Sequence, residues 1–221
     1  MPIVTAVLIA EMLLLCATTD GGKLPAGSRP IVRIGLTGAL LAELAIGGSL
    51  TIERDGRVRL IGAAPDDALL ADICDAIGGH LAGKRLGRVI SALSPRIGGS
   101  SERVVDRLVS ESVLGRDRPS RLRPTRHPVI DLAARQQVVD EVRAAAAGGI
   151  PVRPEIAVVL ALALPCRLAR RVAPSRGTQR AAKRRMQRAT ADAPLAPDVA
   201  KSVDQIVSAV AEIAAAMASA G

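Results

Sequence analysis

Arginine is the residue type whose number and spacing most clearly predict a chemical role in this 221-residue chain. The chain has 30 lysines and arginines against 21 acidic residues, a formal net charge of +9. Nine of the basic residues and no acid fall between residues 167 and 188, so this segment carries the whole net charge. A concentrated positive field attracts anionic partners, either acidic membrane lipids or nucleic acid.

A glycine-rich stretch at residues 78–85, GGHLAGKR, matches part of the pattern of a phosphate-binding loop. Arg85 stands where such a loop requires serine or threonine to hold magnesium. The loop also needs a strand before it, whereas the preceding DDALLADICDAI has the apolar spacing of a helix. We therefore interpret these glycines as the end of a helix.

Histidines and cysteines show no spacing typical of a metal site or a catalytic centre. His80 and His127 share no ligand spacing with each other or with any cysteine, and we expect His80 at a helix end and His127 in an exposed loop. Cys16, Cys74 and Cys166 stand far apart on apolar helical faces, which is typical of inert core thiols in a reducing compartment. The sequence thus predicts no metal, no cofactor and no enzymatic activity.

The first apolar stretch, IAEMLLLCA at residues 9–17, has two interpretations, an export signal or a core helix. A signal peptide needs a basic start, an uninterrupted apolar middle and small residues before the cleavage point. No basic residue precedes Lys23, Glu11 interrupts the stretch, and leucines precede Cys16. We therefore expect a core helix in a cytoplasmic protein. No apolar run reaches the roughly 20 residues that span a bilayer, so we expect any membrane contact to be peripheral, at the cytosolic face.

The elements that must position these residues are predicted to be mostly helical. Alternating apolar residues around Asp55-Gly56 predict one β-hairpin within 50–61, and a Pro- and Arg-rich stretch at 113–130 predicts an exposed hairpin or loop. With no repeat and no linker, we expect a single, mostly α domain over residues 1–221 with two or three short β-hairpins. The segments with helical periodicity are 4–15, 31–46, 66–77, 83–93, 102–113, 130–147, 154–172, 179–190 and 197–217.

The amino-acid composition also helps to decide between the two anionic partners, membrane lipid and nucleic acid. The chain contains no phenylalanine, tyrosine, tryptophan or asparagine. Aromatic stacking on bases and base readout by asparagine are therefore excluded, which weakens a nucleic-acid-binding role without removing the electrostatic attraction. Aromatic membrane anchors are excluded as well.

Five sequence blocks stand in a fixed order along the chain: EMLLL with the turn DGGKL, GLTGALLAELAIGGSLTI, APDDALLADI, ERVVDRLVSESVL and TRHPV. In this order they resemble the Golgi phosphoprotein 3 family over nearly the whole chain. The resemblance implies one helical, non-enzymatic domain that binds phosphatidylinositol 4-phosphate at membranes and holds the cytosolic tails of membrane proteins. It also associates a hairpin at residues 117–124 with self-assembly into homo-oligomers.

The lipid site that the resemblance implies has lost its characteristic residues in this chain. A family tryptophan and arginine align with Ser28 and Thr37, and two family arginines align with Gly98 and Ser101. We therefore expect weakened head-group specificity, with attraction to anionic lipid retained. The alternative function is a basic nucleic-acid-binding module. The basic residues proposed to contact lipid are Arg29, Arg33, Arg96 and Arg103 near the aligned positions, and Arg180, Arg184, Arg185 and Arg188 in the basic segment.

Overall fold

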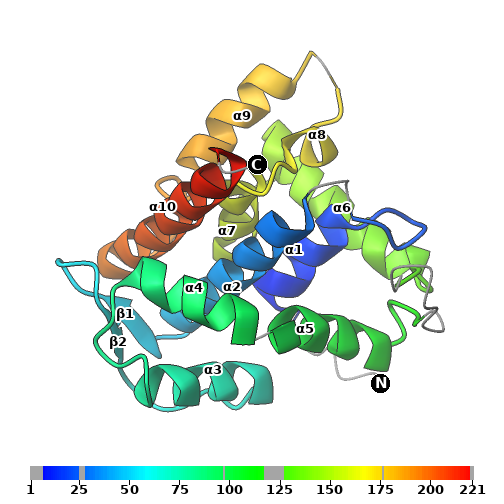
Figure 1. Cartoon of the computed structure of the whole chain (residues 1–221). Helices are drawn as coiled ribbons and strands as arrows, with labels where there is room; N and C mark the ends of the chain where they lie inside the picture. The colour runs from blue at the N-terminus through cyan, green and yellow to red at the C-terminus, as the bar shows by residue number, and fades with distance from the viewer. Residues whose placement is uncertain (1–6, 25–27, 97, 117–126, 176, 220–221) are drawn as a thin grey trace.

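The described part of the chain is a bundle of helices with one small sheet (Figure 1). The computed structural model describes residues 7–24, 28–96, 98–116, 127–175 and 177–219. The helices are α1 (Ile9–Ala17), α2 (Arg29–Ile46), α3 (Ala68–Gly78), α4 (Leu86–Arg96), α5 (Gly98–Ser110), α6 (Leu132–Ala147), α7 (Pro154–Ala163), α8 (Ala169–Val172), α9 (Gln179–Arg188) and α10 (Pro197–Ser219). The strands are β1 (Leu50–Ile52) and β2 (Val58–Leu60).

Helix α2 lies at the centre of the bundle, as its apolar circumference predicts. It contacts α1, α4, α5, α7 and α10, and between residues 31 and 45 only Arg33 and Glu43 are not buried. A side chain at Gly38 would place its Cβ 2.5 Å from the Cγ2 atom of Val210, so glycine here permits the close approach of α10. The expectation of a central helix is confirmed.

Helix α1 is a core helix in which every residue is buried, including Glu11. The expected helical character of this stretch is confirmed, but the helix begins at Ile9, later than its periodicity suggested. Val4 lies outside the described residues, and Val7 is 41% exposed. Figure 1 shows α1 packed beside α2, with α5 crossing near its N-terminal end.

The hairpin around Asp55-Gly56 forms as predicted. Strands β1 and β2 are antiparallel, with Leu50 opposite Leu60 and Ile52 opposite Val58. The amide of Ile52 donates to the hydroxyl of Ser202 at 3.2 Å, which joins the hairpin to α10. This is the one sheet within the described residues, fewer than the two or three hairpins expected.

The second expected hairpin, at residues 113–130, is described only at its base. There Leu114 and Val129 form an isolated antiparallel bridge. Residues 117–126 lie outside the described ranges, and so does the proposed oligomerisation segment 117–124.

Several predicted helix boundaries differ from those of the structure. The segment 154–172 is not one helix but α7 and α8, because Pro165 has no amide hydrogen for the helical ladder and Arg167 adopts a positive φ of 60°. Helix α5 begins at Gly98, four residues early. Helix α4 begins at Leu86 rather than residue 83, since Arg85 forms an isolated bridge with Arg57.

A helix, α3, precedes the glycine-rich stretch 78–85, so the interpretation as a phosphate-binding loop stays rejected.

Candidate functional site

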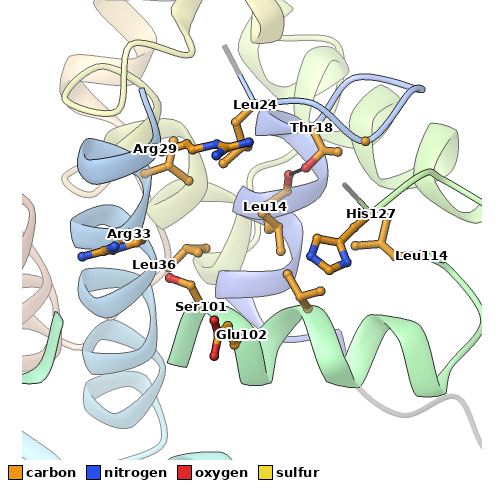
Figure 2. Close-up of a pocket in the computed structure, with 13 residues that line it drawn as sticks. Leu14, Thr18, Leu24, Arg29, Arg33, Leu36, Ser101, Glu102, Leu114 and His127 are labelled. Atoms are coloured by element: carbon orange, nitrogen blue, oxygen red, sulfur yellow. Dashed lines mark hydrogen bonds between the residues drawn. The ribbon is translucent and has the colours of Figure 1, made fainter. Parts of the chain in front are cut away.

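A pocket of about 240 Å³ lies between α1, α2 and α5, and it collects several of the sequence-predicted lipid residues (Figure 2). Arg29 and Arg33 enter from α2, and Ser101 and Glu102 from the first turn of α5. The body of the pocket is apolar, formed by the side chains of Leu14, Leu24, Val32, Leu36, Val105 and Leu114.

Two exposed arginines mark the side of the pocket that reaches solvent. Arg29 and Arg33 are one helical turn apart on α2, and neither guanidinium group makes a hydrogen bond or ion pair with another described residue. Figure 2 shows the Arg29 side chain extending toward α1 and Arg33 extending to the outer side of α2. The exposed acid Glu102 lines the same pocket from α5, beside Ser101 and away from the Arg29 side chain (Figure 2).

The wall opposite α2 is built by two loops that meet at Gly22 and His127. Gly22 has a φ of 70°, and a Cβ there would lie 2.4 Å from the carbonyl carbon of His127, so only glycine allows this contact. The amide of Val129 donates to the carbonyl of Asp20 at 3.3 Å. Arg135 of α6 fixes the first loop by donating to the Asp20 carboxylate at 2.7 Å.

The position of His127 differs from the one predicted from the sequence. It was placed in an exposed loop, but its ring is half-buried and lines the pocket (Figure 2). Its Nδ1 atom is buried and has no hydrogen-bond partner among the described residues. The signal available in the sequence was its place in the block TRHPV, and Glu102 likewise opens the block ERVVDRLVSESVL.

The four positions aligned with the family's lipid site do not form a common surface. Ser28 and Thr37 are buried, and the Thr37 hydroxyl donates to the Arg33 carbonyl at 3.2 Å and lies 3.1 Å from the Ser94 hydroxyl. Ser101 lines the pocket. Gly98 lies at the start of α5.

The arginines near these four positions differ in whether their charge is exposed to solvent or paired with an acid. Arg29 and Arg33 are exposed, whereas Arg103 forms an ion pair with Asp72 of α3. Arg96 is the last residue of α4, and only its backbone is described. The structure therefore brings Arg29, Arg33 and Ser101 to one pocket and leaves Arg103 paired elsewhere.

A second basic region is the outer face of α9, which we call the α9 face (Arg180, Lys183, Arg184 and Arg188). All four side chains are exposed, while Ala182 and Met186 on the opposite side of the helix are buried toward α6 and α7. Within the described residues the one ion pair of this face joins Arg188 to Asp192, at 3.9 Å. Its positive charge is therefore directed at solvent.

Arg185 differs from its neighbours on α9. Its Nη1 atom donates to the carbonyl of Ala146 at 3.4 Å, at the C-terminal end of α6. A cation there is stabilised by the exposed carbonyl groups of the helix end. Arg185 thus connects α9 to α6, and we leave it outside the α9 face.

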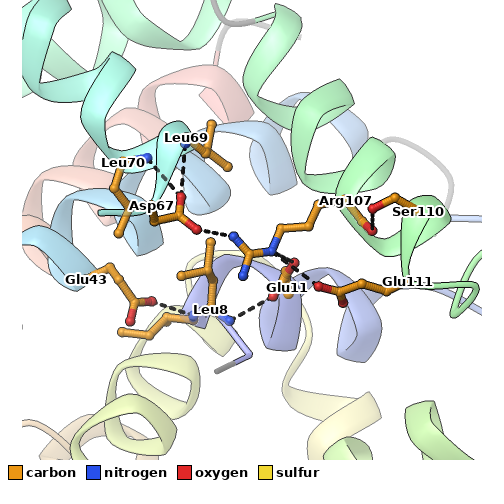
Figure 3. A network of polar contacts seen from close by, with 10 residues as sticks. Leu8, Glu11, Glu43, Asp67, Leu69, Leu70, Arg107, Ser110 and Glu111 are labelled. Atoms are coloured by element: carbon orange, nitrogen blue, oxygen red, sulfur yellow. Dashed lines mark hydrogen bonds and ion pairs between the residues drawn. The ribbon is translucent and has the colours of Figure 1, made fainter. Parts of the chain in front are cut away.

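The third group of charges joins α1, α3 and α5 through the half-buried Arg107, and we call it the buried charge cluster because its Glu11 carboxyl is buried (Figure 3). The Arg107 guanidinium forms an ion pair with Asp67, lies 2.9 Å from the Glu11 carboxylate and lies 3.5 Å from that of Glu111. The Glu11 contact has the distance of an ion pair without the alignment of a hydrogen bond. This buried charge cluster positions α5, and with it Ser101, against α1.

Two carboxyl groups hold the N-terminal end of α1. Glu11 accepts from the Leu8 amide at 2.8 Å, and Glu43 accepts from the Ile9 amide at 2.6 Å. Burial raises the pKa of both carboxyls to about 7, although hydrogen bonds from these amides act in the opposite direction.

The remaining reactive side chains are arranged for packing. Burial raises the pKa of the Cys16 and Cys166 thiols to about 12, so both stay protonated at neutral pH. Among the described residues, no three of histidine, cysteine, aspartate and glutamate gather closely enough to hold a metal ion. No described helix is both long and apolar enough to cross a bilayer.

No curated protein matches the chain. The profile of the family described as Golgi phosphoprotein 3 (GPP34) matches residues 8–206, most of the chain and nearly all of its described helices. The chain belongs to the Golgi phosphoprotein 3 family.

Proposed function

We propose that this protein is a non-enzymatic peripheral membrane protein that binds anionic phospholipid head groups through exposed arginines. The observation that carries the proposal is the α9 face, where Arg180, Arg184 and Arg188 repeat at four-residue spacing and are exposed. Each basic residue near an anionic membrane surface contributes about 1 kcal/mol of attraction. Several such residues acting together give binding without a shaped head-group site.

Head-group selectivity is expected to be weak. Recognition of a phosphomonoester needs several charge-assisted hydrogen bonds that converge on one point. Two aligned positions, Ser28 and Thr37, are buried, and Ser101 offers only a hydroxyl. Arg29 and Arg33 supply charge near Ser101, so we place them as a secondary contact rather than as a phosphoinositide-specific site.

Family membership supports an adaptor role at the cytosolic face of a membrane, with the tails of membrane proteins as partners. Self-assembly through residues 117–124 belongs to the same proposal. Deleting residues 117–124 is expected to leave a folded domain with reduced oligomerisation, measured by light scattering. An unfolded deletion product would instead place the segment in the core.

The test is vesicle co-flotation at low and high salt with three forms of the protein. Wild type is expected to bind phosphatidylserine vesicles at low salt and to leave them at high salt, because salt screens charges beyond a Debye length. R180Q/R184Q/R188Q removes three charges, about 3 kcal/mol at most, and is expected to weaken binding roughly ten- to hundredfold. R180K/R184K/R188K retains the charge and is expected to bind like wild type.

Two results would contradict the proposal. Equal binding to neutral phosphatidylcholine vesicles would exclude an electrostatic mechanism. Tighter binding to duplex DNA than to anionic vesicles at matched salt would favour the nucleic-acid-binding alternative.

A further inference from the structure

The body of the pocket between α1, α2 and α5 is more apolar than head-group binding requires. Leu14, Leu36 and Val105 line it from the three helices, and Leu114 lines it from the loop after α5. A phosphate or a sugar gains nothing from such walls, because burying a polar group without hydrogen bonds costs free energy. The apolar part of the pocket fits a hydrocarbon group instead.

The polar atoms of the pocket are those that an anionic group would use. Arg29 is exposed at its edge without a partner among the described residues, and the Ser101 hydroxyl lies in the first turn of α5. The buried Nδ1 atom of His127 also has no partner within the described ranges, and buried polar atoms in proteins nearly always have one. Apolar walls together with these groups match a ligand that has an anionic head and an apolar chain.

We propose that this pocket binds the hydrocarbon chain of a single-chain anionic amphiphile, a fatty acid or a lysophospholipid, with the head group at Arg29. A buried cavity of about 150 Å³ holds benzene, so by proportion 240 Å³ holds roughly ten carbon atoms. The inference rests on the proposed function in assigning anionic lipid as the ligand, and it adds the class of lipid.

The probe for the test is decanoate, titrated as a monomer into the full chain by isothermal titration calorimetry. Decyltrimethylammonium and 1-decanol have the same chain with a cationic or a neutral head. Decanoate is expected to bind at least tenfold more tightly than decyltrimethylammonium and severalfold more tightly than 1-decanol. R29Q is expected to weaken decanoate binding about fivefold and to leave 1-decanol binding unchanged.

A pair of valines one helical turn apart on α5 supplies the matched control for the cavity. V105F fills the pocket and is expected to lower decanoate affinity at least tenfold. V109F makes the same change at a half-buried position that does not line the pocket and is expected to bind like wild type. If V105F does not fold by circular dichroism, S101F blocks the edge of the pocket and is expected to have the same effect.

The outcomes separate this inference from the proposed function. Absence of saturable decanoate binding by wild type, or undiminished binding by a folded V105F or S101F, would overturn the inference, while flotation with phosphatidylserine vesicles would still support the proposed function. Equal affinity for the anionic and cationic probes would overturn the assignment of an anionic head. Decanoate binding that V105F abolishes supports the inference even where the α9 substitutions leave flotation unchanged, a result that would count against the proposed function alone.

Discussion

Arginine has opposite surroundings in the buried charge cluster and on the α9 face. Arg107 has a side chain only 20% exposed and contacts carboxylates of α1, of the residue that caps α3 and of the turn after α5. Arg188 on the α9 face is 75% exposed and lies 3.9 Å from its nearest acid. The same guanidinium group therefore neutralises charge inside the fold in one region and presents charge to solvent in the other.

The difference shows which charges are available for a partner. Moving a charge away from water costs free energy unless the charge is paired, so Arg107 must stay paired with its carboxylates. Because these acids neutralise it, Arg107 contributes little to the electric field outside the protein. Charges that stay in water keep their hydration when the protein folds, and they interact only weakly with neighbouring charges. The α9 face therefore contributes most of its electrostatic free energy when a large anionic surface approaches. Substitutions in the two regions should thus separate stability from binding.

The largest expected effect is on stability, from Arg107→Ala. The change leaves Glu11 and Asp67 without their cation and is expected to cost about 2–4 kcal/mol, somewhat less than a fully buried pair. Urea unfolding followed by circular dichroism measures it. Arg59→Ala is the control, because its pair with Glu53 is exposed and is expected to contribute less than about 1 kcal/mol. Equal losses in the two variants would refute the distinction between buried and exposed arginines.

The second effect is a pH dependence of stability that arises from Glu43. Its pKa is raised from 4.5 to about 7 in the folded state, so the folded protein binds more protons than the unfolded chain between these values. Stability from this group is complete below pH 4.5 and is lost as the pH rises through 7. Glu11 acts in the same direction.

Glu43→Gln removes this titration and keeps an oxygen that can accept from the Ile9 amide. The variant is expected to be about 1–3 kcal/mol more stable than wild type at pH 8, with a smaller difference at pH 5. Urea unfolding at both pH values measures the change, with the exposed Glu53→Gln as control. A Glu43→Gln protein that loses stability at pH 8 would show that the buried carboxylate is favourable as an anion.

A smaller effect on membrane affinity is expected from the pocket arginines. R29Q/R33Q removes two charges and is expected to lower phosphatidylserine binding about tenfold or less, because the α9 face remains. Co-flotation beside R180Q/R184Q/R188Q ranks the two basic regions. A larger loss in R29Q/R33Q would make the pocket, rather than the α9 face, the main membrane contact.

Much of the fold was readable from apolar spacing, and the α9 charge from composition. The central helix α2 and the Asp55-Gly56 hairpin follow from local patterns, which is why both are confirmed. The division at Pro165 was missed because the apolar residues on both sides keep helical spacing.

The interior sites were less accessible to sequence reasoning. The burial of Glu11 and Glu43 and the position of His127 depend on contacts between segments distant in the chain, such as Glu43 with the Ile9 amide. Local periodicity does not contain such contacts. Only the fold shows which of the arginines predicted to contact lipid remain exposed: Arg29 is exposed, whereas Arg103 is paired with Asp72.

The most direct test of the central claim, that membrane charge rather than head-group identity sets affinity, is a lipid panel at constant net charge. Wild-type protein is floated with vesicles whose negative charge comes either from phosphatidylserine or from phosphatidylinositol phosphates that differ only in phosphate position. We predict affinities within tenfold of one another across the panel. A preference of tenfold or more for phosphatidylinositol 4-phosphate, about 1.4 kcal/mol, would contradict the claim and show that the arginines around the pocket form a specific head-group site.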